Sequence, residues 1–577
     1  MNIKSIIAKH IKQALTYKKI IISHDLMIFR VSDKKKWDYQ VNGIIKIAKN
    51  LNTNPYSISQ YVAFNINSYK YNIYNKIEVS KLGFINIFIN TDWIEKKILQ
   101  ITESFRLGVK KVKPQKIIID YSSPNIAKEM HVGHLRSTIL GDATARMMEF
   151  LGHTVIRINH IGDWGTHFGI VIAYLKKKSI PYKEIDDIDL DQLYQHAKKQ
   201  FDTDSKFSQM ARKYVVKLQN QDQECIQIWK KIVKYTIVKN EKIYKKLNVT
   251  LRNEHIIGES FYKNMLPEIV SDLKDKKIAQ KCNGALIVFL NEFKNRHNEP
   301  MGVLVKKDDN AFLYATIDLA SLRYRCKTLH ADQILYYIDS RQQQYLQQIF
   351  KIAKKAKYIS NNIILKHHAF GMICSDNKKP FKTRSGKNVK LFKLLNEAIK
   401  RAKEITKDKN KNLSEKQLNY LSEKIGIGAV KYFDLSKNRL TNYVFKWDKI
   451  LSFDGNTAPY MQYAYIRILS IFRKLNISVL KLTGKIKLLE EYERKLAIKL
   501  LQFEEILLES SENGIPHIMC KYLYELSTIF SKFYEKHSIL CSSNNKIRNS
   551  RLLLSLLTAR TLKKGLFLIG ISTIKYM

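Results

Sequence analysis

The sequence predicts an α/β nucleotide-binding core of Rossmann type with helical insertions, a small α/β domain before it and an all-α domain after it. Three observations lead to this prediction. The chain has 577 residues, more than the roughly 250 to 300 that one hydrophobic core organises. A strand–helix–strand pattern runs from Lys116 to Asn159, as in a βαβ unit. From about Gly455 onward only helical patterns remain.

Residues 1–110 are predicted to form the N-terminal α/β appendage. A helical pattern opens this segment, and short apolar runs such as GFINIFI, from Gly83 to Ile89, are typical of strands. The composition changes at Pro114, so the core is expected to occupy residues 111–454 and the helical domain residues 455–577.

The core begins with the βαβ unit. KIIID, from Lys116 to Asp120, is an apolar run of the buried-strand type. From about Met130 apolar residues recur three or four apart, and Gly152 stands where a helix would end. HTVIRIN, from His153 to Asn159, supplies the second strand.

The patterns that predict the rest of the core are less regular than those of the βαβ unit. Residues of about 174–256 are lysine-rich and helical, which indicates an insertion. Apolar runs return at 284–290, 302–305 and 334–338, where we expect the same sheet to resume. The charge-dense stretch 400–416 is expected to be a solvated helix and linker.

Composition gives weaker indications. The net charge of +48 favours a polyanionic partner such as nucleic acid, but Lys and Asn fill even the apparent linkers, so a solvated basic face is the simpler alternative. No apolar run approaches the ~18 residues of a membrane span, and no cleavable leader is evident; we expect a cytoplasmic chain. The cysteines are too widely spaced for a zinc or redox motif and are expected to be free thiols: Cys225, Cys282, Cys326, Cys374, Cys520 and Cys541.

The segment from Asp120 to Asp142 carries the most specific chemistry. A strand feeds a loop, and the loop feeds a helix whose first turn contains His131, Gly133 and His134. A helix N-terminus favours phosphate, two histidines on one face could donate to it, and glycine lets a nucleotide approach the backbone. A surface pair or half of a metal site is the alternative, and no nearby Cys or third His supports a metal.

These motifs resemble those of a known family. HVGH, from His131 to His134, is similar to the HIGH signature of class I aminoacyl-tRNA synthetases, and the surrounding SSPNIAKEMHVGHLRST resembles the version found in the arginine-specific family. The resemblance covers nearly the whole chain through further motifs: HIGDWGTHFG (160–169), GESFY (258–262), LYATIDLA (313–320), YYIDSRQQQ (336–344), GNTAPYMQYAYIR (455–467) and LTARTLKKGLFLIGI (557–571).

The resemblance implies roles for individual residues. His131 and His134, with Gly133 between them, would bind ATP phosphates, and Lys128 would neutralise developing charge. The amino-acid substrate would be bound by Ser123, Asn125, Glu259, Tyr314, Asp318 and Gln342. A planar cation with five donors suits carboxylates and a phenol. Each residue alone has an ordinary alternative: a helix cap for Asp318, a surface position for Glu259 and core packing for Tyr314.

One motif departs from the class pattern. No KMSKS loop is present, and the nearest counterpart is KPFKTRSG, from Lys379 to Gly386. Lys382 and Arg384 are therefore candidates to hold pyrophosphate, with a basic solvated loop as the alternative. Because many arginine enzymes share this degeneration, Lys128 is the stronger candidate for charge neutralisation.

The family resemblance implies the reaction and the partners. The carboxylate of arginine would attack the α-phosphorus of ATP, with Mg²⁺, and the terminal adenosine of tRNA(Arg) would then attack the adenylate. Residues 1–110 would touch the tRNA elbow and 455–577 the anticodon. A class I enzyme for another amino acid, a small-molecule adenylyl-forming enzyme and an inactive RNA-binding paralogue are the alternatives. We expect a monomer and no membrane partner.

Overall fold

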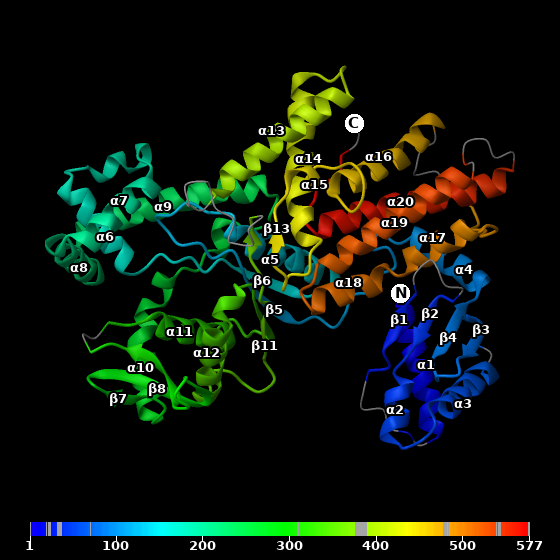
Figure 1. Ribbon diagram of the computed structural model, residues 1–577, viewed down its shortest axis with the longest axis horizontal. Helices are drawn as coiled ribbons and strands as arrows, with labels where there is room; N and C mark the ends of the chain where they lie inside the picture. Colours follow the sequence, from blue (N-terminus) through cyan, green and yellow to red (C-terminus); the bar gives the residue numbers. More distant parts are fainter. Residues whose placement is uncertain are drawn as a thin grey trace.

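The structure, a computed structural model, describes the whole chain apart from a small set of residues and the side chain of Asp187. Figure 1 shows the parallel sheet near the middle, with the N-terminal domain and the C-terminal helices to its right and two lobes to its left. The set left undescribed is 1, 19, 21–24, 32–36, 70, 309–310, 376–388, 477–481, 483, 538, 540–543 and 575–577.

The N-terminal part is a small α/β unit, as the apolar runs predict. Its four strands form an antiparallel sheet in the order β1-β2-β4-β3, and the run at 83–89 becomes β4. Its elements are α1 (Ile3–Tyr17), β1 (Ile28–Arg30), β2 (Tyr39–Val41), α2 (Ile44–Asn50), α3 (Pro55–Ser68), β3 (Tyr74–Val79), β4 (Ile85–Ile89) and α4 (Thr91–Thr102).

The βαβ prediction is confirmed. β5 (Lys116–Asp120), α5 (Gly133–Leu151) and β6 (Thr154–Ile158) follow in order, and Gly152 ends the helix with a positive φ of 104°, a conformation that costs glycine little. β10 (Gln333–Tyr336) and β11 (Ile364–His367) complete a parallel sheet in the order β11-β10-β5-β6. Both β6 and β10 pair with β5, so β5 delivers its C-terminal loop to the middle of the sheet.

The sheet is buried on both faces, as parallel sheets usually are. Ile117 and Ile119 of β5 pack in one cluster with α5 and the C-terminal helices. Ile118, pointing the other way, packs in a second cluster with residues of α11 (Tyr314–Lys327) and α12 (Gln343–Lys355). The signature helix α5 is therefore enclosed by the core.

The predicted helical insertion is confirmed, but the strand runs that follow it do not all rejoin the sheet. Residues 280–282, 285–294 and 300–306 form a separate antiparallel sheet, β7-β8-β9, and of the predicted runs only the one near 334 returns to the parallel sheet. An apolar run shows that a strand is buried without showing which strand it pairs with. The elements are α6 (Thr166–Lys177), η1 (Tyr182–Asp187), α7 (Leu190–Thr203), α8 (Ser205–Gln219), α9 (Gln223–Lys246), η2 (Asn253–His255), η3 (Glu259–Met265), α10 (Leu266–Asp275), β7 (Gln280–Cys282), β8 (Ala285–Lys294), β9 (Pro300–Lys306) and η4 (Ser340–Gln342).

Helices dominate the rest of the chain. In the described part of 455–577 every element is a helix, as predicted. Two short strands that precede this region, β12 (Ile373–Cys374) and β13 (Tyr443–Val444), pair in parallel. The helices are α13 (Leu391–Lys409), α14 (Glu415–Leu435), α15 (Trp447–Ile450), α16 (Ala458–Lys474), α17 (Glu491–Leu501), α18 (Phe503–Glu512), α19 (His517–Lys536) and α20 (Asn545–Leu568).

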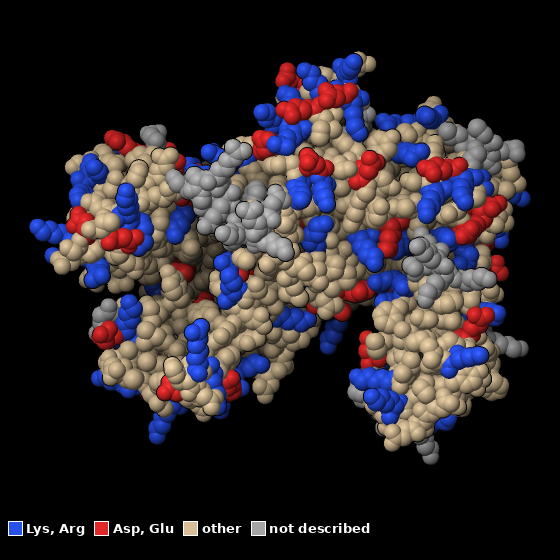
Figure 2. Space-filling model, viewed as in Figure 1, with Lys and Arg blue, Asp and Glu red and all other residues tan. Residues whose placement is uncertain are grey.

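Charge is spread over the surface. On the face in Figure 2, Lys and Arg side chains lie on every part of the molecule with acidic side chains among them. This distribution gives no single basic stripe on that face. No described helix is long and apolar enough to cross a membrane, and the described cysteines are free thiols.

A buried ion pair fixes the signature helix to α14. Arg136 of α5 lies 3.2 Å from Asp434 (Nε to Oδ2), and both side chains are almost fully buried. Arg136 also donates to the carbonyl oxygens of Gly371 and Thr441. Breaking a buried pair leaves an uncompensated charge, so we expect Arg136→Met to lower the free energy of unfolding by about 3–5 kcal/mol.

Urea unfolding followed by circular dichroism measures this change. The double variant Arg136→Met, Asp434→Leu is the control, since removing both charges should recover most of the loss. Equal losses in the single and double variants would contradict an electrostatic origin.

Candidate active site

The loop after β5 has an unusual backbone. Ser122, Ser123 and Ala127 have positive φ values of 73°, 47° and 63°, a region that side-chain-bearing residues seldom occupy. Local strain of this kind is often found at functional sites. The Ser122 hydroxyl lies 2.8 Å from the Tyr244 hydroxyl and accepts from Thr138, so the surrounding helices hold the loop in place.

The two signature histidines lie side by side at the start of α5. Their ring centroids are 4.1 Å apart. The backbone N–H of His131 donates to Nδ1 of His134 at 3.1 Å, and that of Gly133 donates to Nδ1 of His131 at 3.0 Å. Because each Nδ1 accepts, each neutral ring must carry its proton on Nε2. Both rings are thereby set as Nε2–H donors.

Burial keeps both rings neutral. It lowers the pKa of His134 to about 3, with the neighbouring His131 adding to the effect. Burial and then the positive charge of Lys128 lower the pKa of His131, partly opposed by Asp191. Neutral imidazoles donate without a permanent charge, whereas Lys128 places a positive charge near His131.

Lys128 and Gly133 lie close to the histidine pair. The Lys128 ammonium is 4.7 Å from the ring centroid of Tyr194 on α7. A Cβ on Gly133 would lie 2.7 Å from Cε1 of His131, so a side chain there would displace the ring. This is a more specific reason for glycine than close approach of a nucleotide.

Ser123 and Asn125 lie where β5 meets the loop after β6. The Ser123 hydroxyl donates to Asp120 at 2.9 Å and accepts from the backbone N–H of His160 at 3.2 Å. Asn125 pairs with Gly162, where a Cβ would lie 2.4 Å from the Asn125 side-chain oxygen. Both residues therefore sit at the carboxyl end of the sheet, where ligands of open α/β sheets bind.

A group of acidic and phenolic side chains lies at the same edge. Burial, then Asp318, then Asp163 raise the pKa of Glu259 to about 8, and one Glu259 oxygen, Oε2, is buried without a hydrogen-bond partner. Burial also raises the pKa of Asp318. Burial and then Glu259 raise the pKa of Tyr314. Among the described residues no cation pairs with Glu259 or Asp318, so a cationic ligand could supply the missing positive charge.

Three further residues were missed by the sequence analysis. Tyr345 of α12 donates to Oδ2 of Asp318 at 2.5 Å. Asp163 accepts from both the backbone and the hydroxyl of Ser260, and His160 lies near enough to lower the pKa of Asp163 and Asp318. His160 and Asp163 lie in a motif already noted, whereas no local pattern marks Tyr345.

One of the predicted pocket residues, Gln342, stands apart from the group. Gln342 is exposed at the end of η4, and none of the side-chain contacts resolved for the described residues joins it to Glu259 or Asp318. Lys382 and Arg384 lie outside the described residues.

The histidine pair and the acidic group belong to one site. Lys128 lowers the pKa of both His131 and His167, and a Cβ on Gly165, two residues before His167, would lie 3.9 Å from the Tyr314 hydroxyl. Tyr194 of α7 also interacts with Tyr314 of α11. The surface is hollowed between the lobes that contain these helices (Figures 1 and 2).

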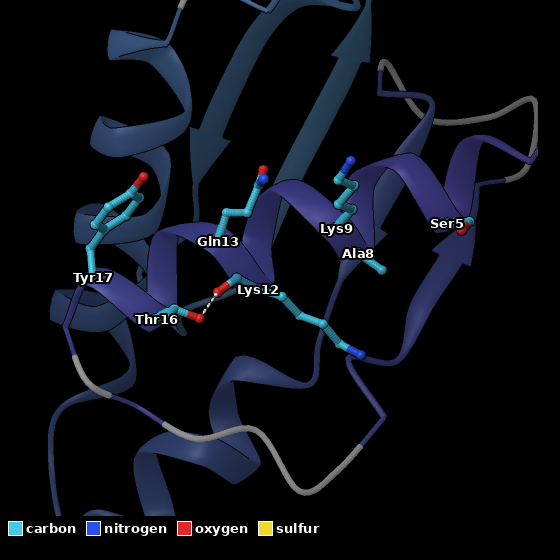
Figure 3. A pocket seen from close by; sticks show the side chains of 7 residues that line it. All are labelled: Ser5, Ala8, Lys9, Lys12, Gln13, Thr16 and Tyr17. Carbon is cyan, nitrogen blue, oxygen red and sulfur yellow. Dashed lines mark hydrogen bonds between the residues drawn. The ribbon is translucent and has the colours of Figure 1, made fainter.

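A separate hollow on the N-terminal domain does not resemble this site. Its lining comes from one helix, α1, and Figure 3 shows the Thr16 hydroxyl donating to the Lys12 carbonyl. It contains no acidic side chain. The lining residues are Ser5, Ala8, Lys9, Lys12, Gln13, Thr16 and Tyr17.

The raised pKa of Glu259 predicts a pH-dependent affinity for a cation. Below about 8 the Glu259 carboxyl is largely protonated, so a cation must displace a proton to bind it. We expect the KM for a guanidinium substrate to fall by about 25-fold between pH 6.5 and 8.5, because each unit of pH below a pKa changes the ionised fraction by about tenfold. Steady-state kinetics across this range measure the change, and a flat profile would contradict it.

Comparison with known proteins agrees with this geometry. Residues 97–447 match the model of the class I (R) tRNA synthetase catalytic domain, 461–577 the DALR anticodon binding domain, and 1–89 the arginyl tRNA synthetase N-terminal domain. The parallel sheet, the HVGH turn and the helical C-terminal region thus define a class I aminoacyl-tRNA synthetase fold.

Comparison with individual relatives shows which family of this class the chain belongs to. The chain is 72% identical to an arginine–tRNA ligase of Buchnera aphidicola subsp. Baizongia pistaciae and 47% identical to one of Yersinia enterocolitica, covering 100% of each. The crystal structure of Plasmodium falciparum arginyl-tRNA synthetase superposes with a TM-score of 0.85 at 32% identity over 100% of both chains. The chain belongs to the arginyl-tRNA synthetase family.

Proposed function

We propose that this chain activates arginine with ATP and transfers it to tRNA(Arg). The observation that carries the proposal is the group formed by Glu259, Asp318 and Tyr314, two acids and a phenol with which no described cation pairs, in the same site as the histidine pair of α5. A guanidinium brings five N–H donors in one plane, and carboxylates with free oxygens match them by charge-assisted hydrogen bonds.

In the proposed first step the arginine carboxylate attacks the α-phosphorus of ATP, and pyrophosphate leaves. His131 and His134 donate from Nε2 to phosphate oxygens, and Lys128 neutralises the charge that develops. Ser123 and Asn125 bind the amino-acid backbone, whereas Gln342, Lys382 and Arg384 remain candidates on sequence grounds alone. Positioning and charge stabilisation dominate phosphoryl chemistry, so the step requires no protein base.

Mg²⁺ is proposed to bind with the triphosphate. Among the described residues no group of three or more His, Cys, Asp or Glu side chains could hold a metal ion, and Mg²⁺ commonly binds substrate phosphates with waters and one or two carboxylates. When bound it neutralises phosphate charge. Lys128 and the two histidines then orient the remaining phosphate oxygens.

The proposal assigns tRNA contacts to the two ends of the chain. Residues 111–454 perform the chemistry, 1–110 touch the tRNA elbow and 455–577 bind the anticodon, as the matched DALR domain supports. We further propose a monomeric, cytoplasmic enzyme, and light scattering of the purified chain with and without tRNA tests the monomer.

Aminoacylation of tRNA with each of the 20 radiolabelled amino acids tests the proposed function. We expect charging with arginine alone, dependent on ATP and Mg²⁺. Charging with another amino acid would overturn the assignment of Glu259 and Asp318 while leaving the class of reaction intact. Folded chain that bound tRNA but charged nothing would favour an inactive RNA-binding paralogue.

A further inference from the structure

We propose that Tyr345 is a positioning residue that sets the specificity of the cation pocket, by holding the Asp318 carboxylate in the orientation that a guanidinium requires. The inference rests on the proposed function, since it concerns how the same pocket distinguishes arginine from other cationic substrates. Tyr345 lies directly after the YYIDSRQQQ motif, which ends at Gln344.

The contact between Tyr345 and Asp318 joins two helices. Tyr345 lies in the first turn of α12 and Asp318 in α11, and the Tyr345 hydroxyl donates to Oδ2 of Asp318. The described residues form no other hydrogen bond to this carboxylate. An aspartate carboxylate rotates about a soft torsion, so this single bond decides where its second oxygen, Oδ1, points.

Tyr345 acts as the donor in its contact with Asp318. Burial, then Asp318 and its hydrogen bond, then Glu259 and Tyr314 raise its pKa well above the ordinary value. The hydroxyl therefore stays protonated at every pH at which the enzyme works. Its proton goes to Oδ2, and the acceptor positions of Oδ1 remain for a ligand.

The groups around Asp318 leave its Oδ1 oxygen available to a cationic ligand. Arg325 lies near Asp318 but is buried in an ion pair with Asp120 at 2.7 Å. His160 faces Asp318 from the loop after β6, its Nδ1 engaged with the Ile257 carbonyl. The other neighbours are Tyr336, a buried phenol, and the carboxyls of Asp120 and Glu259, none of which carries a positive charge. No described cation therefore pairs directly with Asp318.

Two carboxylates then face the pocket from separate elements. Glu259 is carried by η3, and its Oε2 is buried without a partner; Asp318 is carried by α11 and fixed by Tyr345. A planar guanidinium can satisfy two fixed acceptors at once, whereas an ammonium is a compact point charge. Fixing Asp318 therefore favours guanidinium over ammonium, and releasing it should weaken that preference.

Tyr345→Phe tests the inference, because it removes only the hydroxyl. We expect the KM for arginine to rise about tenfold in ATP–pyrophosphate exchange with tRNA present, with kcat and the KM for ATP changed less than about twofold. The preference for arginine over lysine, as the ratio of kcat/KM values, should fall by about tenfold. Tyr420→Phe, at an exposed site on α14, is the matched control and should change none of these.

A double-mutant cycle separates this role from a structural one. In an Asp318→Asn background, Tyr345→Phe should change the KM for arginine less than about twofold, because the carboxylate that it orients is gone. Full additivity would overturn the proposal, as would a Tyr345→Phe variant with unchanged arginine KM and preference. If the unaltered enzyme charged no arginine, the proposed function itself would fall, a result distinct from either of these.

Discussion

Replacing His134 by alanine is expected to lower kcat for ATP–pyrophosphate exchange by about 100- to 1000-fold, the usual cost of removing one fixed donor to a developing charge. The His134 ring is locked by the N–H of His131 on Nδ1, which fixes the proton on Nε2. Alanine removes this donor and leaves the His131 N–H unpaired. Single-turnover adenylate formation under saturating arginine and tRNA measures the chemical step directly.

Two observations would distinguish this role from a structural one. The matched control is His297→Ala, at an exposed position, which should retain full activity. Because the pKa of His134 is about 3, its protonation cannot contribute to any change in rate between pH 6 and 8. A variant with a normal melting temperature and normal adenylate formation would rule out the phosphate-donor role.

The sequence predicts the local elements of the core well. β5, α5 and its stop at Gly152 follow from apolar spacing and from a glycine placed where a left-handed residue is needed. These features depend on residues close together in the chain. The sheet to which β8 and β9 belong could not be predicted, because strand pairing between distant segments leaves no periodic signal in either run.

In the candidate site, too, the sequence predicts what neighbouring residues determine and not what distant segments determine. His131, Gly133 and His134 are adjacent, so their geometry follows from one helical turn, whereas Tyr345 reaches Asp318 from another helix. Gln342 stays a prediction from the motif, whereas the contact of Tyr345, three residues later in the chain, with Asp318 is visible only in the structure. Contacts of this kind depend on how α11 and α12 pack, which local patterns do not specify.

Replacing Glu259 by glutamine is expected to lower kcat/KM for arginine by about 100- to 1000-fold while making the protein more stable to heat. The amide is nearly isosteric but removes the charge that the guanidinium pairs with, and losing one partner of a buried charge pair commonly costs about 2–5 kcal/mol. Arginine-dependent pyrophosphate exchange measures the loss. The KM for ATP should stay nearly constant, since Glu259 belongs to the acidic group rather than to the histidine pair.

The gain in stability has a definite pH dependence. The pKa of Glu259 is raised to about 8 in the folded chain, above its ordinary value near 4.5, so the unfolded chain loses this proton first as the pH rises. The carboxyl therefore destabilises the fold progressively from about pH 4.5 and fully above about pH 8. The melting temperature of Glu259→Gln should exceed that of the unaltered protein by more at pH 8.5 than at pH 5.

A matched substitution shows whether the effect belongs to this site. Glu404→Gln removes a charge from an exposed position on α13 and should leave both arginine kinetics and melting temperature unchanged. A Glu259→Gln variant that lost activity without gaining stability at pH 8.5 would mean that another group already compensates the carboxylate. The acidic group would then be a satisfied network, and the argument that it awaits a cation would fail. Activity traded against stability at one residue is the pattern expected where a fold keeps an uncompensated charge for its substrate.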